Sequence, residues 1–430
     1  MLKALKKLWN NDRGNILILG GAALPLLVGA AGLATDTIQW ALWKRQIQRS
    51  ADSAAIAGVY DRALSSGSTS GTATAVAHDL VLNQQTGIAL QPGYPQVAYP
   101  ADTSTMKLQV QVTLGVRKEL SFSSLFMDTP PLIVASATAA SVPGHDSYCL
   151  VSLENTTATG IEGSGNANVN FSCGMVTNSV ASNAAIAKGS SVMHATVIAA
   201  AGGIQESNNW QVDKYDPFVP AQDDPFKNLA PDSTDQGNCT GADQLTGSPG
   251  AGSTWSPGCY TSINIGSNKK ATLNPGTYFI NAGGVNIQGE LVGHGVTIIL
   301  GNTSTAANAT IGSFDMNSNG LADLIAPDAG KWKGMAIYQD RRAVNSGGSL
   351  ASAPNKINGN STNAIQGALY FPNQAVAYNG NGTSGFQCTQ FVVRRIIFTG
   401  NNTTQNKFTD DCAALGMTKI DGGRLVRLVA

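Results

Sequence analysis

Six cysteines offer the clearest chemistry in this sequence, and their spacing favours disulfide bonds over metal binding. They stand at Cys149, Cys173, Cys239, Cys259, Cys388 and Cys412. They form no CxxC pair and no Cys/His spacing of a zinc site. An even number of cysteines without such spacing is typical of disulfides in an oxidising compartment. We favour sequential pairing, Cys149–Cys173, Cys239–Cys259 and Cys388–Cys412; six buried thiols are the alternative.

A calcium loop is the next candidate. Asp315, Asn317, Asn319, Gly320 and Asp323 match positions 1, 3, 5, 6 and 9 of an EF-hand loop. Position 12 should be a bidentate Glu, but the sequence has Ala326 there. The flanking residues predict a strand and a turn instead of two helices. We therefore interpret the segment as an Asn-Gly corner and expect no bound metal.

The remaining polar residues form no recognised catalytic pattern. His78, His145, His194 and His294 are isolated, and there is no GxSxG, P-loop or GxGxxG followed by a helix. Two arginine pairs could contribute to a carbohydrate site: Arg341 and Arg342 beside Asp340, and Arg394 with Arg395. We expect the first pair to begin a loop, and one side chain of the second pair to face solvent. The sequence thus predicts no catalytic residue and no cofactor.

A long apolar stretch must position everything else. Ile16–Leu33 has no charge, and its uncharged run ends at Asp36. About 20 such residues are enough to cross the bilayer core as a helix. The pattern continues as a helix to Leu64, so an uncleaved anchor is favoured over a cleaved signal peptide. Trp40 and Trp43 follow the run, where interfacial aromatic residues occur.

Charge indicates an orientation for this span. The N-terminal flank has four basic residues against Asp12, and the other flank has three against two acidic residues; the basic ones are Lys3, Lys6, Lys7, Arg13, Lys44, Arg45 and Arg49. The excess favours a cytoplasmic N-terminus, and the cysteines all lie beyond the span. The whole chain has 27 basic and 27 acidic residues, and only 13% of its residues are charged. The zero net charge gives no global field for nucleic acid. The low share of charged residues, with many small polar residues, is typical of exported β-rich proteins.

Beyond the span the pattern changes from helical to extended. We expect helices over 36–64 and Thr72–Leu90. Met106–Val116 alternates apolar and polar residues as a half-buried strand does, and Leu132–Ala140 predicts a second strand.

These N-terminal pieces together resemble TadE/TadG-like Flp (tight adherence) pilus-assembly proteins. The resemblance rests on Asp12-Arg-Gly-Asn, the Leu24-Pro25 core, Thr35-Asp36 and Arg49-Ser-Ala-Asp-Ser-Ala-Ala-Ile-Ala-Gly58. It extends through the predicted strands to about residue 143. Members cut by prepilin peptidase carry a Glu shortly after the Gly at the cleavage site, and this chain has none after Gly14. The resemblance therefore implies a TadG-like, uncleaved membrane component of the pilus-assembly system.

The rest of the chain predicts an all-β domain. Short apolar strands between Gly and Asn turns begin near Gly144, and a Pro-rich, loop-like insert lies near 213–258. A parallel β-helix or solenoid is favoured over a β-sandwich, because Gly276–Ile298 runs as strand, Gly turn, strand and Gly turn, with no Asn-Gly or Asp-Gly hairpin signal. Gly334–Asp340 and Gly367–Pro372 also resemble the C-terminal region of TadG-like proteins. Cys149–Cys173 would then secure the first turn of the stack, Cys388–Cys412 the last, and Cys239–Cys259 the insert.

The expected organisation is a cytoplasmic basic tail (1–14), a transmembrane helix (15–35), a pilin-like module (36–143) and a periplasmic β-rich domain (144–430). The expected function is a non-enzymatic, single-pass component of the inner membrane. Its partners would be the bilayer and other pilus-assembly proteins, with no nucleic acid. A membrane-tethered protein that binds or cleaves carbohydrate is the alternative.

Overall fold

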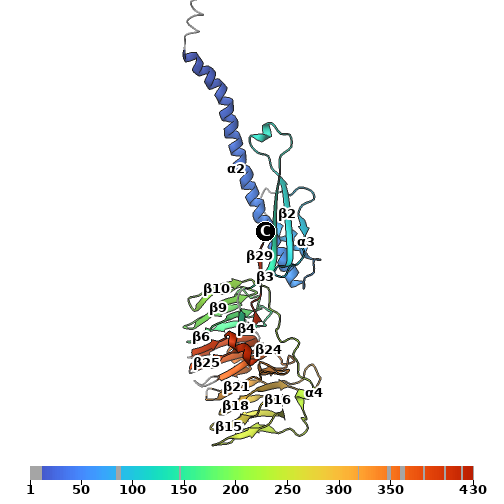
Figure 1. Ribbon diagram of the computed structural model, residues 1–430, viewed down its shortest axis with the longest axis vertical. Helices are drawn as coiled ribbons and strands as arrows, with labels where there is room; N and C mark the ends of the chain where they lie inside the picture. The colour runs from blue at the N-terminus through green and yellow to red at the C-terminus, as the bar shows by residue number, and fades with distance from the viewer. Residues whose placement is uncertain are drawn as a thin grey trace, which may run out of the picture. The chain divides into compact units, whose positions relative to one another are not determined.

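The computed structural model describes residues 12–83, 89–144, 147–317, 319–345, 350–358, 364–380, 383–400, 403–417 and 420–429. The basic tail to residue 11 and His145 lie outside these ranges. The chain forms two compact units: Met1–Pro143 with Leu425–Ala430, and Gly144–Arg424. Figure 1 shows their elements.

The first unit is built on one long helix, α2 (Asp12–Leu64). The helix continues past Pro25 without a break, as expected for a span that runs directly into a second helical segment. The unit also contains α3 (Thr72–Asn83) and the strands β1 (Gln96–Ala98), β2 (Lys107–Arg117), β3 (Leu132–Pro143) and β29 (Arg424–Leu428), which form a sheet in that order. The second helix was predicted to reach Leu90, but it ends at Asn83, and residues 84–88 are outside the described part.

Small residues let α2 lie close to this sheet. Ala51, Ala54 and Ala55 are fully buried against the apolar faces of β2 and β3. A Cβ on Gly58 would lie 2.8 Å from Val110 Cγ1, so a larger residue there would push the helix away from the sheet. The predicted alternation of Met106–Val116 is present: Val110, Val112 and the other inward side chains of β2 are buried.

The second unit is mostly parallel β-structure, arranged in three rows of stacked strands. The first row contains β13 (Gly258–Tyr260), β16 (Gly276–Asn281), β19 (Val296–Gly301), β22 (Met335–Gln339), β24 (Ala364–Gly380), β26 (Thr389–Gly400), β4 (Ser147–Ser152), β7 (Gly174–Thr177), β9 (Val192–Ala200) and β10 (Trp210–Pro217). Each pairs in parallel with the next in this order.

The other two rows accompany it. The second row contains β11 (Gln244–Thr246), β14 (Ser262–Ile265), β17 (Val285–Ile287), β20 (Phe314–Met316), β23 (Asn355–Ile357), the second halves of β24 and β26, β5 (Ile161–Gly163) and β8 (Ala185–Ala187). The third row contains β12 (Ser253–Trp255), β15 (Lys270–Leu273), β18 (Glu290–His294), β21 (Leu321–Ile325) and the start of β24, and then β25 (Thr383–Gln387), β27 (Thr403–Lys407), β6 (Asn168–Phe171) and the starts of β9 and β10.

The parallel register brings like positions of successive strands together. Ile263 pairs with Val285, and Val285 with Phe314; all three are buried. Because each strand repeats the same inward and outward alternation, the apolar side chains form continuous columns in the core.

The first strands of the second unit pair with its last long strands: β4 lies beside β26, with Val151 opposite Val392, and β6 lies beside β27. The chain therefore enters and leaves the stack in its middle. The backbone N–H of Gly144 donates to the carbonyl of Gly423 at 2.7 Å. In Figure 1, β9 and β10 lie at one end of the stack and β15 at the other, with β4, β6, β24 and β25 between them. We call this contact, of β4 with β26 and of β6 with β27, the central seam.

Three expectations need correction here. Cys149–Cys173 and Cys388–Cys412 lie in turns at the central seam, whereas the outermost strands are β10 at one end and β11–β13 at the other. The Pro-rich stretch 213–258 is strand at both ends; only residues 218–243 form a connection, the crossing segment, which joins one end of the stack to the other. The expected second domain extended to residue 430, but Leu425 is buried in the first unit and Val429 donates its N–H to Thr138 at 2.8 Å.

Candidate membrane-anchoring site

The N-terminal half of α2 presents large apolar side chains that remain exposed in the described part of the first unit. Leu24, Leu26 and Leu27 are 62, 76 and 69% exposed, and Val28 and Leu33 are also exposed. The helix is long and apolar enough to cross a membrane. An exposed apolar surface of this length is costly in water, so a bilayer is the environment that fits it.

Asp36 ends this apolar stretch and fixes the loop between β2 and β3. Its carboxylate accepts the backbone N–H groups of Phe122 at 2.8 Å and Ser123 at 2.6 Å, as well as the Ser123 hydroxyl. One turn further, Gln39 donates to Ser121 Oγ at 2.7 Å and accepts the Ser121 N–H at 3.1 Å. Asp36 is only 4% exposed. These bonds satisfy the buried charge and hold the loop at one level of the helix.

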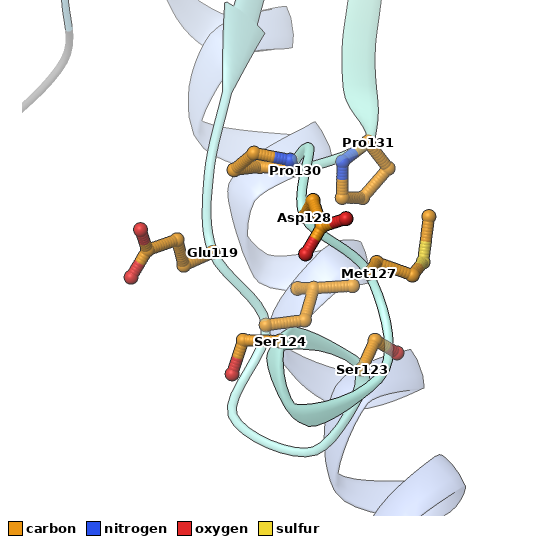
Figure 2. Close-up of a pocket in the computed structure, with 8 residues that line it drawn as sticks. Glu119, Ser123, Ser124, Met127, Asp128, Pro130 and Pro131 are labelled. Carbon is orange, nitrogen blue, oxygen red and sulfur yellow. The ribbon is translucent and has the colours of Figure 1, made fainter.

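The β2–β3 loop contains the short 3-10 helix η1 (Ser123–Leu125) and surrounds a pocket of about 370 Å³. Figure 2 shows that Asp128 points into the space between the arms of the loop, whereas the carboxylate of Glu119 points away from it. The pocket is open and contains no cluster of side chains with a catalytic or metal-binding arrangement. At the tip, Leu125 and Phe126 are 73 and 75% exposed.

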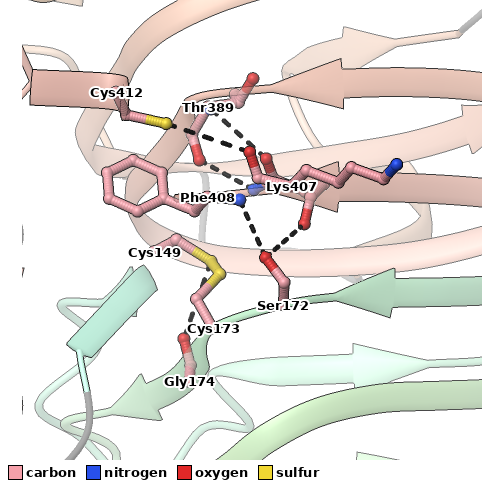
Figure 3. The surroundings of a disulfide bond; sticks show 9 residues. Cys149, Ser172, Cys173, Gly174, Thr389, Lys407, Phe408 and Cys412 are labelled. Carbon is pink, nitrogen blue, oxygen red and sulfur yellow. Dashed lines mark hydrogen bonds between the residues drawn. A yellow bond between two sulfur atoms is a disulfide. The ribbon is translucent and has the colours of Figure 1, made fainter. Parts of the chain in front are cut away.

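All six cysteines form disulfide bonds in the structure, in the three sequential pairs that were predicted. The Cα–Cα distances are 5.8 Å for Cys149–Cys173, 5.1 Å for Cys239–Cys259 and 5.2 Å for Cys388–Cys412. The first and third bonds lie at the central seam. Figure 3 shows how that seam is also joined by Ser172, whose Oγ accepts the N–H of Phe408 at 2.9 Å.

A buried ion pair crosses the same seam. Glu154, which follows β4 and is 1% exposed, accepts a bond from Arg394 Nε of β26 at 2.9 Å and from the Thr156 N–H at 3.0 Å. Burial raises the pKa of the Glu154 carboxyl, but hydrogen bonds from Arg394 and Thr156 and the charge of Arg394 outweigh burial and lower it below its usual 4.5. Arg395 donates to the Thr159 carbonyl at 2.9 Å. The expectation that one of the two arginines faces solvent was wrong: their side chains are only 19 and 14% exposed, because both contact the first turn.

The other arginine pair holds chain segments together. Arg341 donates to the carbonyls of Leu229, at 2.9 Å, and Phe226, both in the crossing segment. Arg342 pairs with Asp340 at 2.7 Å. Tyr338, whose hydroxyl also reaches the Leu229 carbonyl at 3.0 Å, has its pKa raised to about 12, chiefly by burial.

The crossing segment is also fixed near its helix α4 (Ser233–Gln236). Asp235 accepts a bond from Trp332 Nε1 at 2.6 Å and pairs with Lys331 at 2.5 Å. Asp232 caps α4, and its hydrogen bond from Lys331 is the main cause that lowers its pKa to about 2.

The suspected calcium loop is a turn between two strands. Asp315 lies 3.7 Å from Lys356, and Asp323 lies 3.2 Å from His294. Asn317 Oδ1 accepts the N–H groups of Asn319 and Gly320, so it shapes the corner. Among the described residues, no three His, Cys, Asp or Glu side chains lie close enough to hold a metal ion.

Sequence reasoning missed the roles of Asp36 and Glu154. Asp36 was recognised only as the charge that ends the apolar run, because its partners Phe122 and Ser123 lie 86 and 87 residues further along the chain. Glu154 gave no signal, since its partner is far away in sequence.

Comparison with known proteins identifies the N-terminal segment. Residues 14–63 match the family described as "Putative Flp pilus-assembly TadE/G-like", and this range covers nearly all of α2. No curated protein and no solved structure matches the chain. The predicted resemblance to this family is confirmed over these residues, and it associates the chain with Flp pilus assembly.

Proposed function

We propose that this chain is a non-enzymatic, single-pass component of a bacterial Flp pilus-assembly system, anchored in the inner membrane. The match of residues 14–63 to the TadE/G-like family carries the proposal. The uncovered apolar half of α2 supports a membrane span. The basic residues before the span support a cytoplasmic N-terminus, and three disulfides in the second unit support a periplasmic body.

We also infer that the second unit is a parallel β-solenoid. Parallel pairing along all three rows supports a solenoid over a sandwich, whose strands are mostly antiparallel. The polar groups considered for carbohydrate chemistry are engaged in holding the stack and its crossing segment. A spacer or anchor for the pilus in the envelope is the role that such a rigid, disulfide-bonded unit suits.

Topology and assembly can be tested in the same strain. A reporter active only in the periplasm is fused after Ala430, which follows the partly exposed Val429. We expect an active fusion that still supports surface pili, and loss of pili when the gene is deleted. A reporter active only in the cytoplasm should be inactive there; its activity would refute the orientation. Normal piliation of the deletion strain would refute the role in assembly.

A further inference from the structure

The tip of the β2–β3 loop is an apolar surface that the proposed anchor does not explain. The consecutive residues Leu125, Phe126 and Met127 are 73, 75 and 50% exposed, and Leu132, further along the chain, is 40% exposed. Three consecutive exposed apolar side chains in one loop, followed by Leu132 at the start of β3, are unusual on a surface that faces only water. No residue in the described part of the first unit covers them.

The structure fixes the level of this tip along α2. Asp36 holds Phe122 and Ser123 by their backbone N–H groups. The Phe122 ring lies against Gly32, where a Cβ would be 2.3 Å from the ring. Gly32 is one helical turn, about 6 Å, inside the apolar run, so the aromatic side chain reaches back alongside the span.

The rest of the tip follows Phe122 at that level. The rings of Phe122 and Phe126 are 5.3 Å apart. At the base of the loop the groups are those of a membrane interface: Lys118 Nζ lies 4.5 Å from the centre of the Trp43 ring, and Trp40 is 43% exposed nearby in sequence. The loop thus has an apolar tip beside the apolar helix and a charged, aromatic base beside the polar helix.

We propose that this tip inserts among the acyl chains of the leaflet nearest Asp36, where the apolar run of α2 ends. The tip would be a second membrane contact of the first unit. The inference rests on the proposed membrane span. The occupant is lipid, because the loop is bonded to the helix at the residue where the apolar run ends, and any bilayer that covers Leu33 also reaches the Phe122 ring. Two contacts would restrict the tilt and rotation of α2, whereas a single helix leaves both free.

The test uses the full-length protein in nanodiscs of phosphatidylethanolamine and phosphatidylglycerol, with or without doxyl-labelled lipid. A cysteine is introduced by Phe126→Cys and labelled with the environment-sensitive dye NBD without reductant, which leaves the disulfides intact. Leu27→Cys in the span is the positive control. Ser68→Cys is the negative control, because it is exposed beyond the far end of α2.

At position 126 we expect blue-shifted emission and roughly twofold quenching by doxyl lipid, stronger for labels near the headgroup than for labels deep in the chain, as for a shallowly inserted apolar side chain. Position 68 should not respond. Quenching at 27 without quenching at 126 would refute insertion of the loop tip but leave the membrane span of α2 supported. The exposed tip would then be a surface for a protein partner. No quenching at 27 would instead refute the span itself.

Discussion

The ion pair between Glu154 and Arg394 should be the most sensitive polar contact of the central seam. Replacing Glu154 by Gln keeps the volume and one acceptor for the Thr156 N–H, but removes the charge that faces Arg394. Arg394→Gln removes the other partner. The exposed Lys227–Asp223 pair, 55 and 89% exposed, provides the matched control through Asp223→Asn.

The expected cost follows from the burial of the two groups. Removing one partner of a fully buried ion pair costs about 3–5 kcal/mol, since the other charge is left uncompensated. Here the carboxylate is 1% exposed but the Arg394 side chain is 19% exposed. Water can therefore reach the guanidinium in the variant, and we expect about 2–3 kcal/mol for Glu154→Gln. Asp223→Asn should cost less than about 0.5 kcal/mol, as exposed pairs do.

Hydrogen exchange of the full-length protein measures this locally, as the opening free energy of peptides from β4 and β26. Glu154→Gln should lower it at the seam and leave the first unit unchanged. The double variant Glu154→Gln with Arg394→Gln should lose less than the sum of the single variants. Equal exchange in wild type and Glu154→Gln, or full additivity, would refute the reasoning.

The same pair predicts a pH dependence. The pKa of Glu154 is lowered in the folded state, so its contribution to stability is complete above the usual pKa of 4.5. It is lost as the pH falls through the lowered folded value. The acid loss of protection at the seam should therefore be smaller in Glu154→Gln than in the wild type.

Three further outcomes are expected. Cys388→Ser opens a loop that contributes about 3 kcal/mol in the chain-entropy model, so exchange should rise in β26 and β27 and not in α2; six free thiols in non-reducing peptide maps would contradict the pairing. Asp235→Ala removes the bonds from Trp332 and Lys331 and should cost about 1–3 kcal/mol locally, seen as faster exchange in residues 226–236, with Asp223→Ala as control. Intact mass should show an unprocessed N-terminus, because no Glu follows Gly14; a product that begins at Asn15 would indicate prepilin-type cleavage.

Much of the first unit could be predicted because its signals are local. The apolar run before Asp36 is long enough to need no partner, and the alternation in Met106–Val116 specifies a strand by itself. Parallel strands beyond Gly144 were also indicated, by short apolar runs between Gly corners. What these signals share is that each is contained in one short stretch of chain.

The order of the stack could not be predicted, because it depends on pairing between distant segments. Val151 opposite Val392 is chemically no different from many other apolar pairs in the sequence. Neighbouring elements usually pack together, so the simplest expectation placed the first and last turns at opposite ends. The Pro-rich composition of 213–258 marked a connection, but not that it runs from one end of the stack to the other.

This topology also explains how the two outer ends stay unpaired. Both connections to the first unit leave from the central seam, where Gly144 donates its N–H to the Gly423 carbonyl. In the described part of the chain, β10 pairs only with β9, and it carries Asp213, Lys214 and Asp216. At the other end, β11 and β12 have three residues each. Charges and very short strands both discourage pairing of an exposed edge with another chain. Both outer ends of the stack therefore carry features that oppose edge-to-edge association with a second copy.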